Sequence, residues 1–106
     1  MRRGEIWWVD FDSAKGSEIK KRRPAVIVSN DGSNTAQSRV QVVPFTSQTA
    51  RVYPWEALVS IKGKQSKAMA DQIRTVTKTR LVSIVGTVSS RELGAIESAL
   101  RFQLGL

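Results

Sequence analysis

The chain has 106 residues, 41% of them apolar, which suffices for one hydrophobic core but not for two independent domains. Lysine and arginine number 17 against 9 acidic residues, so the net charge is +8. This balance favours a polyanionic partner: nucleic acid, an acidic protein or an anionic membrane surface. We therefore expect a single basic domain over residues 1–106.

The composition also excludes several kinds of chemistry. The sequence contains no cysteine and no histidine, which excludes disulfides, thiol nucleophiles, Ser-His-Asp triads and imidazole or thiolate metal sites. No apolar run approaches the ~20 residues of a membrane span, and the N-terminus lacks the apolar segment of a signal peptide. We expect a cytoplasmic protein with no membrane partner, no metal and no cofactor. Its chemistry would then depend on carboxylates, Arg, Lys, Tyr, hydroxyls and backbone N–H groups.

Residues 4–10 are expected to form the first strand. The run is rich in aromatic and β-branched residues, and its alternation places Trp7 and Trp8 on opposite faces. This pattern predicts core on both sides of the strand, or one tryptophan packed against a partner subunit. Residues 11–23 show no clean period and are expected to form a long loop, of a length that is often functional.

A run of cations leads into the second expected strand, residues 24–29. Pro24 fixes its own backbone and favours extended geometry at Arg23, so Arg23 is held in place while the cations before it can move. A guanidinium held at the mouth of a strand is suited to binding phosphate. The alternative is an ordinary solvated basic loop.

The next segment contains a turn, a strand and a hydroxyl-rich loop. Residues 30–32 are a turn signal, and polar loop is expected to continue to Ser38. A third strand is expected over residues 40–45, followed by Thr46, Ser47, Gln48 and Thr49. Such a loop can donate hydrogen bonds to a phosphate, or it can be an ordinary set of turn residues.

The second half predicts a hairpin, a further strand and a terminal helix. Residues 55–61 and 66–70 are expected to pair across a tight turn. Residues 71–75 place a carboxylate, an amide, a guanidinium and a hydroxyl at a strand end. If this segment is extended, Asp71 and Thr75 share one face while Gln72 and Arg74 share the other; the alternative is a surface ion pair near a turn.

A strand over residues 83–88 should lead into the helix. Ser89 and Glu92 fit a capping box at its start, and Leu93, Ile96, Leu100 and Leu104 form one apolar stripe along it. Five or more short strands and one terminal helix indicate a mainly β protein of the α+β class, built as a small, strongly curved antiparallel sheet or barrel.

Several short motifs together resemble one family. They are Arg3-Gly4-Glu5-Ile6-Trp7, Gly16-Ser17-Glu18, Arg23-Pro24 with its apolar strand, Val43-Pro44-Phe45-Thr46-Ser47, Gln72-Ile73-Arg74-Thr75 and the closing helix. In this order, over essentially the whole chain, they resemble the MazF/PemK toxins of bacterial type II toxin–antitoxin systems. The resemblance implies an SH3-like barrel of the CcdB/PemK type. It also implies a homodimer that cleaves single-stranded RNA at short motifs without a metal and is inhibited by an acidic antitoxin.

The resemblance also implies the residues of the site. Arg23 and Thr46 match the catalytic pair of the family, and Asp71 matches a carboxylate that serves as general base in part of it. We expect Arg23 to stabilise the phosphate and Thr46 to donate a hydrogen bond to it. The expected RNA-binding residues are Lys15, Lys20, Lys21, Arg22, Ser47, Gln48, Gln72 and Arg74.

Two departures from the family pattern limit what can be transferred. Some relatives have a histidine in the first loop, and this chain has none; some have an arginine two residues before the carboxylate, where this chain has Met69. The preferred arrangement therefore has Asp71 as base and Arg23 as the electrophilic group. Tyr53, Trp55 and Phe45 would stack on bases or pack in the core.

Three functions remain open from the sequence. The first is an endoribonuclease acting on messenger RNA, with ribosomal or transfer RNA as alternative targets. The second is a toxin of the same fold that binds and poisons DNA gyrase, and the third is a small barrel that only binds RNA. The joint presence of Arg23, Thr46 and Asp71 favours the enzyme.

Overall fold

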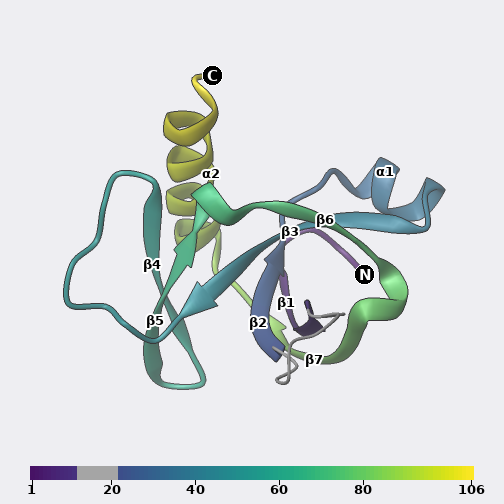
Figure 1. Ribbon diagram of the computed structural model, residues 1–106, viewed down its shortest axis with the longest axis horizontal. Helices are drawn as coiled ribbons and strands as arrows, with labels where there is room; N and C mark the ends of the chain where they lie inside the picture. The colour runs from purple at the N-terminus through teal and green to yellow at the C-terminus, as the bar shows by residue number, and fades with distance from the viewer. Residues whose placement is uncertain (12–21) are drawn as a thin grey trace, which may run out of the picture.

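The structure is a computed structural model that describes residues 1–11 and 22–106. These residues form seven strands, two α-helices and two single 3-10 turns (Figure 1). The strands are β1 (Glu5–Asp10), β2 (Arg22–Ile27), β3 (Arg39–Thr46), β4 (Glu56–Ile61), β5 (Lys64–Met69), β6 (Arg74–Thr77) and β7 (Leu81–Thr87). The helices are α1 (Asp31–Ala36) and α2 (Ser90–Leu104), and the 3-10 turns are η1 (Ala70–Gln72) and η2 (Lys78–Arg80).

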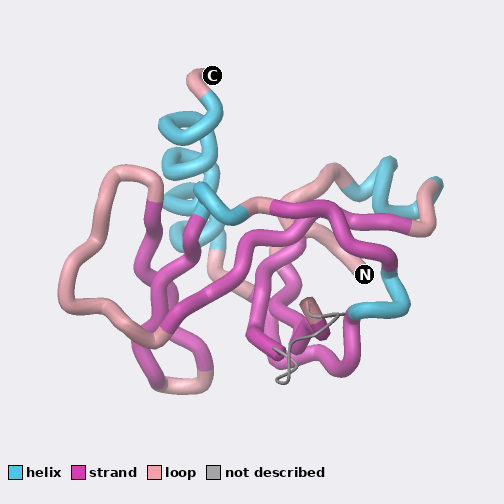
Figure 2. The backbone as a smooth tube through the Cα atoms, in the orientation of Figure 1, coloured by secondary structure: helices cyan, strands magenta, loops and turns pink. Residues whose placement is uncertain are grey.

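All strand pairs are antiparallel, in the order β4-β5-β3-β2-β1-β7, with β6 paired to β3 off this path. Strand β3 is the longest and has three partners. Its first half pairs with β6, its middle with β2, and its last two residues with β5. It therefore joins a curled sheet to the projecting β4–β5 hairpin, as Figure 2 shows. The expected strongly curved antiparallel sheet with a terminal helix is confirmed.

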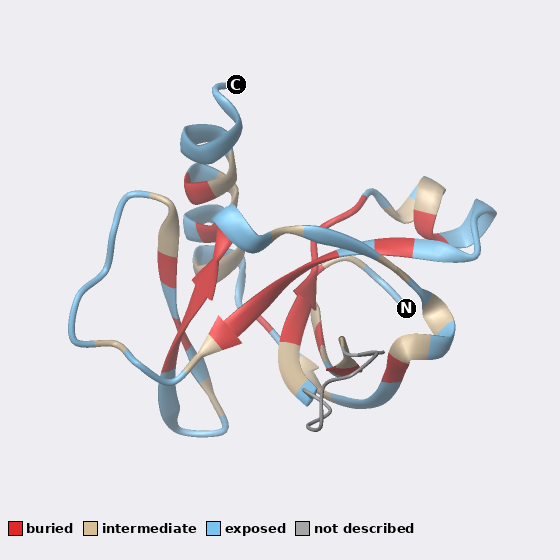
Figure 3. Ribbon diagram, in the orientation of Figure 1, coloured by how far each residue is buried: buried red, intermediate tan, exposed pale blue. Residues whose placement is uncertain are grey.

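The alternating side chains of β2 and β3 divide the core into two clusters. On β2, Val26 lies in a cluster with α2 and the β4–β5 hairpin, whereas Ala25 and Ile27 lie in a second cluster inside the curl. This division follows from the two-residue period of a strand, because both faces of the central strands are covered. Figure 3 shows the buried stretches of β2 and β3 crossing the middle of the molecule.

Helix α2 begins as predicted. The Ser89 hydroxyl accepts the Glu92 N–H at 3.1 Å, and the Glu92 carboxylate accepts the Ser89 N–H at 2.9 Å. Ile96 is fully buried against the β4–β5 side of the core. Within the described ranges, no helix combines the length and the apolar character needed to cross a membrane.

The structure corrects the polar loop expected to continue to Ser38. Residues Asp31–Ala36 form helix α1, with Asn30 as N-cap accepting the Gly32 N–H at 2.6 Å. Asn34 is buried and donates to the Ser29 carbonyl oxygen at 2.9 Å. Small polar residues favour both turns and helix N-caps. Here the contact of buried Asn34 with Ser29 favours the helix.

The expectation for residues 71–75 is also corrected, whereas core on both sides of β1 is confirmed. Ile6 is buried in the first cluster and Val9 in the second, against which Trp7 also packs; Trp8 itself is 42% exposed. Asp71 and Gln72 lie in η1, and β6 begins only at Arg74. The extended geometry that would divide these side chains between two faces is therefore absent from residues 71 and 72.

Candidate nucleic-acid interface

An open pocket of about 560 Å³ lies where β2, the end of β3 and the β4–β5 hairpin meet. Among the residues that the structure describes, three cations line it, Arg22, Arg23 and Lys64, and no acidic side chain does. The other lining residues are Trp8, Pro24, Phe45, Thr46, Ser47, Gln48, Ile61 and Ser66. Positive charge over an apolar floor suits a ligand with a phosphate and a planar base.

Strand pairing places Arg23 at the pocket. In the antiparallel ladder of β1 and β2, Arg23 lies opposite Val9 and Pro24 lies opposite Trp8. Arg23 is half-buried and Arg22 is exposed. Arg23 thus follows the expectation from the sequence that it is held at a strand mouth, although β2 begins at Arg22 and not at Pro24.

Thr46 reaches the same pocket from the end of β3. Its hydroxyl oxygen accepts the backbone N–H of Gln48 at 3.3 Å. Since a hydroxyl has one hydrogen to donate and two lone pairs, this contact leaves the Thr46 hydrogen free for an acceptor in the pocket. Ser47 and Gln48 follow directly and line the pocket from the loop after β3.

The remaining predicted site residues lie elsewhere in the fold or outside the described residues. Asp71 and Gln72 are exposed in η1, which packs against α2, and neither lines the pocket. Arg74 lies at a separate basic pocket of about 320 Å³, where its guanidinium is 5.1 Å from the ring centre of Phe11. Lys15, Lys20 and Lys21 fall within residues 12–21, outside the described residues. The structure therefore brings together Arg22, Arg23, Thr46, Ser47 and Gln48, and the role of Asp71 stays a prediction.

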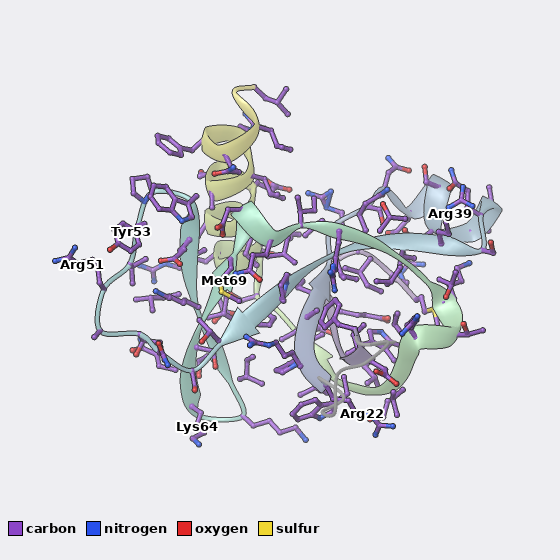
Figure 4. All side chains as sticks on the ribbon, viewed as in Figure 1. Arg22, Arg39, Arg51, Tyr53, Lys64 and Met69 are labelled. Carbon is purple, nitrogen blue, oxygen red and sulfur yellow. The ribbon has the colours of Figure 1, made fainter. Side chains whose placement is uncertain are left out.

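Sequence reasoning missed four residues of the pocket: Trp8, Ile61, Lys64 and Ser66. Lys64 stands at the hairpin turn, and Figure 4 shows it at the same end of the molecule as Arg22. The turn at residues 62–64 was visible in the sequence as basic. Nothing in the sequence indicated that the hairpin would fold beside β2, because strand order is decided by long-range pairing.

The carboxyl groups with shifted pKa values serve the fold. The backbone N–H of Arg3, which donates to Asp31 at 2.7 Å, lowers the pKa of that carboxyl group. Burial raises the pKa of Glu5, but hydrogen bonds from the Arg2 N–H and the Trp7 indole outweigh it and lower the pKa overall. Residues 1–11 and 22–106 bring together no group of three or more acidic side chains able to hold a metal ion.

Comparisons with known proteins show similarity over nearly the whole chain. A model of the PemK-like, MazF-like toxins of type II toxin–antitoxin systems matches residues 2–104. The endoribonuclease MazF9 of Mycobacterium tuberculosis is 47% identical over 115 aligned positions, covering 100% of this chain and 98% of the relative. The endoribonuclease toxin MazF of Escherichia coli K12 is 35% identical over 103 positions, covering 96% and 92%.

Solved structures show the same fold. A mycobacterial endoribonuclease in complex with its cognate antitoxin superposes with a TM-score of 0.84 at 27% identity, covering 100% of this chain and 96% of that one. A MazE–MazF structure from Deinococcus radiodurans has a TM-score of 0.84 at 26% identity, with the same coverage. Because the family model and the relatives both span nearly the whole chain, this protein belongs to the PemK-like, MazF-like toxins of type II toxin–antitoxin systems.

Proposed function

We propose that this protein is an endoribonuclease toxin that cleaves single-stranded RNA at short sequence motifs, without a metal, using the 2′-OH of the substrate as nucleophile. The observation that supports it best is the pocket itself, in which Arg23 and the free hydroxyl hydrogen of Thr46 face one basic cavity. The names of the relatives support the reaction class. They do not favour the gyrase-binding alternative.

The proposed reaction needs no group that this chain lacks. The 2′-OH oxygen bonds to phosphorus, its proton passes to a base, and the bond to the 5′-oxygen breaks as that oxygen gains a proton. The products are a 2′,3′-cyclic phosphate, or the 3′-phosphate formed by its hydrolysis, and a 5′-hydroxyl. Arg23 would stabilise the charge that develops on the phosphorane, and Thr46 would donate a hydrogen bond to a non-bridging oxygen.

Asp71 is the proposed base; it lies in η1 and does not line the pocket. Replacing Asp71 with Asn keeps the size of the side chain but removes its ability to accept the proton. If Asp71 is the base, the variant should lose at least ~100-fold in kcat. A variant with the kcat of the native protein would transfer the role to another group.

The partners proposed are a second copy of the chain and an acidic antitoxin. Exposed apolar side chains, among them Trp8, Ile84 and Phe102, support a homodimer. Several similar structures are described as antitoxin complexes, and the net charge of +8 suits an acidic partner. We propose that the antitoxin competes with RNA for the basic pocket; an inhibited complex whose antitoxin lies wholly elsewhere would contradict this.

The central test is cleavage of an RNA oligonucleotide in the presence of EDTA. We expect cutting, with products bearing a 5′-hydroxyl, and no cutting when the 2′-OH at the cleaved position is replaced by hydrogen. Arg23→Ala should reduce kcat by at least ~1,000-fold because it removes the charge that stabilises the phosphorane. Arg39→Ala is the matched control, since Arg39 is exposed at the start of β3, far from Thr46 at its end.

Three results would contradict the proposal. They are a requirement for a divalent cation, cleavage of the 2′-deoxy substrate, or native activity in the Arg23→Ala variant. If none of these results is found, sequencing the cut ends of total RNA after brief expression would identify the motif and the class of RNA that is cleaved.

A further inference from the structure

Lys67 is a buried lysine, and the packing of the sheet alone does not explain its burial. In β5, its neighbours Ser66 and Ala68 point to the opposite face, and Ala68 belongs to the core cluster under α2. Lys67 must therefore point away from that core. Yet its side chain is only 10% exposed, and lysine is seldom buried unless it is paired.

The cover over Lys67 is the loop that connects β3 to β4, residues 47–55. The ammonium group donates to the backbone carbonyl oxygen of Arg51 at 2.7 Å and pairs with Oε1 of Glu56 at 2.9 Å. It also lies 5.8 Å from the ring centre of Tyr53. Figure 4 shows Arg51 and Tyr53 on this loop, which arches out beside β4.

Glu56 completes the arrangement from the other end of the loop. Its Oε1 accepts the backbone N–H of Tyr53 at 3.0 Å as well as the Lys67 ammonium, and its side chain is only 8% exposed. Lys67, Glu56 and the Arg51 carbonyl oxygen form what we call the loop clamp. Hydrogen bonds to buried charged groups are among the stronger ones in proteins, so the clamp fixes the middle of the loop to the hairpin.

The loop clamp is connected to the proposed site at two points. Lys67 lies directly opposite Thr46 in the β3–β5 ladder. The loop that it holds begins with Ser47 and Gln48, which line the pocket. The path of the loop after Thr46 therefore decides where these two polar side chains stand beside a bound nucleotide, and such base-edge contacts are what select sequence in single-stranded RNA.

We propose that Lys67 and Glu56 are positioning residues that fix loop 47–55 and thereby set the base preference next to the cleaved phosphodiester. The proposal rests on the proposed endoribonuclease function. Lys67 itself is not expected to contact RNA, because the loop encloses its ammonium group. The clamp acts through Ser47 and Gln48.

The main variant is Lys67→Met, which keeps the aliphatic stem and removes the ammonium. The matched control is Lys78→Met, which changes the net charge equally at η2, between β6 and β7. Each is assayed on the preferred RNA and on substrates that differ by one base beside the cut. We expect Lys67→Met to lower the ratio of kcat/KM between the preferred and altered substrates by about tenfold, mainly through KM, while Lys78→Met keeps the native ratio.

A second readout is independent of catalysis. Hydrogen exchange of the backbone amides in residues 47–56 should be faster in Lys67→Met than in the native protein, with exchange in α2 unchanged. If Lys67→Met does not fold, because it leaves Glu56 buried and unpaired, the double variant Lys67→Met/Glu56→Met removes both charges and takes its place.

The outcomes separate the two proposals. If the native protein cuts no RNA, the proposed function fails, whatever the exchange data show. Suppose instead that the native protein cuts RNA, and that Lys67→Met has a smaller folded fraction but keeps the native selectivity ratio and the native rate of loop exchange. The clamp is then merely structural, and the positioning proposal is overturned. Faster loop exchange together with a lower selectivity ratio supports it.

Discussion

At the scale of single residues, the pocket contains one cation, Arg23, whose exact position matters, and others for which the charge alone matters. Arg23 is half-buried and lies on β2 opposite Val9 of β1, whereas Arg22 beside it is exposed. Thr46 has one hydrogen-bond partner in its own loop and one hydrogen left to donate. Because both groups are set by strand pairing, a small change of side chain at either position should affect chemistry more than folding.

Thr46→Val tests this for the hydroxyl. Valine has nearly the same shape as threonine, so the strand should persist, but the donor to the phosphate and the acceptor for the Gln48 N–H are both lost. We expect kcat to fall by roughly 10- to 100-fold, measured with saturating RNA. Thr87→Val, at an exposed position on β7, is the control. A Thr46→Val variant with native kcat would remove Thr46 from the catalytic residues.

At the scale of elements, helix α2 shows how local signals and packing combine. The capping box satisfies donors at its first turn, Ile96 and Ala99 bury one face, and Gly105 ends it with φ at +71°. The Glu92 carboxylate also accepts the Ser60 N–H at 2.9 Å, which ties the start of the helix to β4. Both local sequence and tertiary contact therefore fix where this helix begins.

Glu92 gives α2 a dependence on pH. Partial burial raises the pKa of Glu92, but the hydrogen bonds from the Ser89 and Ser60 N–H groups outweigh it, so the pKa lies below the usual 4.5. A pKa that is lower in the folded state means that Glu92 stabilises the fold above about pH 4.5, and that this contribution is lost as the pH falls through the folded-state pKa. The difference in unfolding free energy between the native protein and Glu92→Gln, measured by denaturant titration, should shrink from pH 7 to pH 3. A constant difference would contradict this account.

Gly94 is a second test on the same helix. It is exposed within α2, and a Cβ built at this position meets nothing within 4 Å. Gly94→Ala should therefore raise the unfolding free energy by about 1 kcal/mol, because alanine loses less backbone entropy in a helix. Gly105→Ala should have the opposite sign, since the left-handed conformation at Gly105 disfavours a side chain. Equal effects of the two substitutions would refute the argument.

At the scale of the whole molecule, the excess of cations should make RNA binding strongly dependent on salt. Each phosphate neutralised contributes about −0.7 to the slope of log K against log salt for a single strand. We expect Arg22→Gln to reduce the magnitude of the slope by about 0.7, and Arg39→Gln to leave it unchanged. The measurement is fluorescence anisotropy of an RNA with a 2′-deoxy nucleotide at the cut site. An unchanged slope in Arg22→Gln would show that Arg22 contacts no phosphate.

The local part of the fold was predictable because it depends on short-range chemistry. The alternation of residues 4–10, the apolar run after Pro24, the hairpin and the capping box of α2 all follow from backbone periods and hydrogen bonds within a few residues. Helix α1 was missed because Asn30 and its neighbours favour a turn and an N-cap equally, and only the buried contact of Asn34 with Ser29 distinguishes them.

Composition and local patterns were enough to predict the basic charge, the exclusion of histidine and thiol chemistry, the antiparallel curled sheet and the position of Arg23 and Thr46 at strand ends. Which of these strand ends meet is a property of the three-dimensional fold alone. It placed Arg22, Arg23 and Thr46 on one pocket with Lys64, and it placed Asp71 and Arg74 outside that pocket. It also enclosed Lys67 beneath a loop. The physical reason is that strand order and loop path depend on burial between residues distant in sequence, which no local pattern specifies.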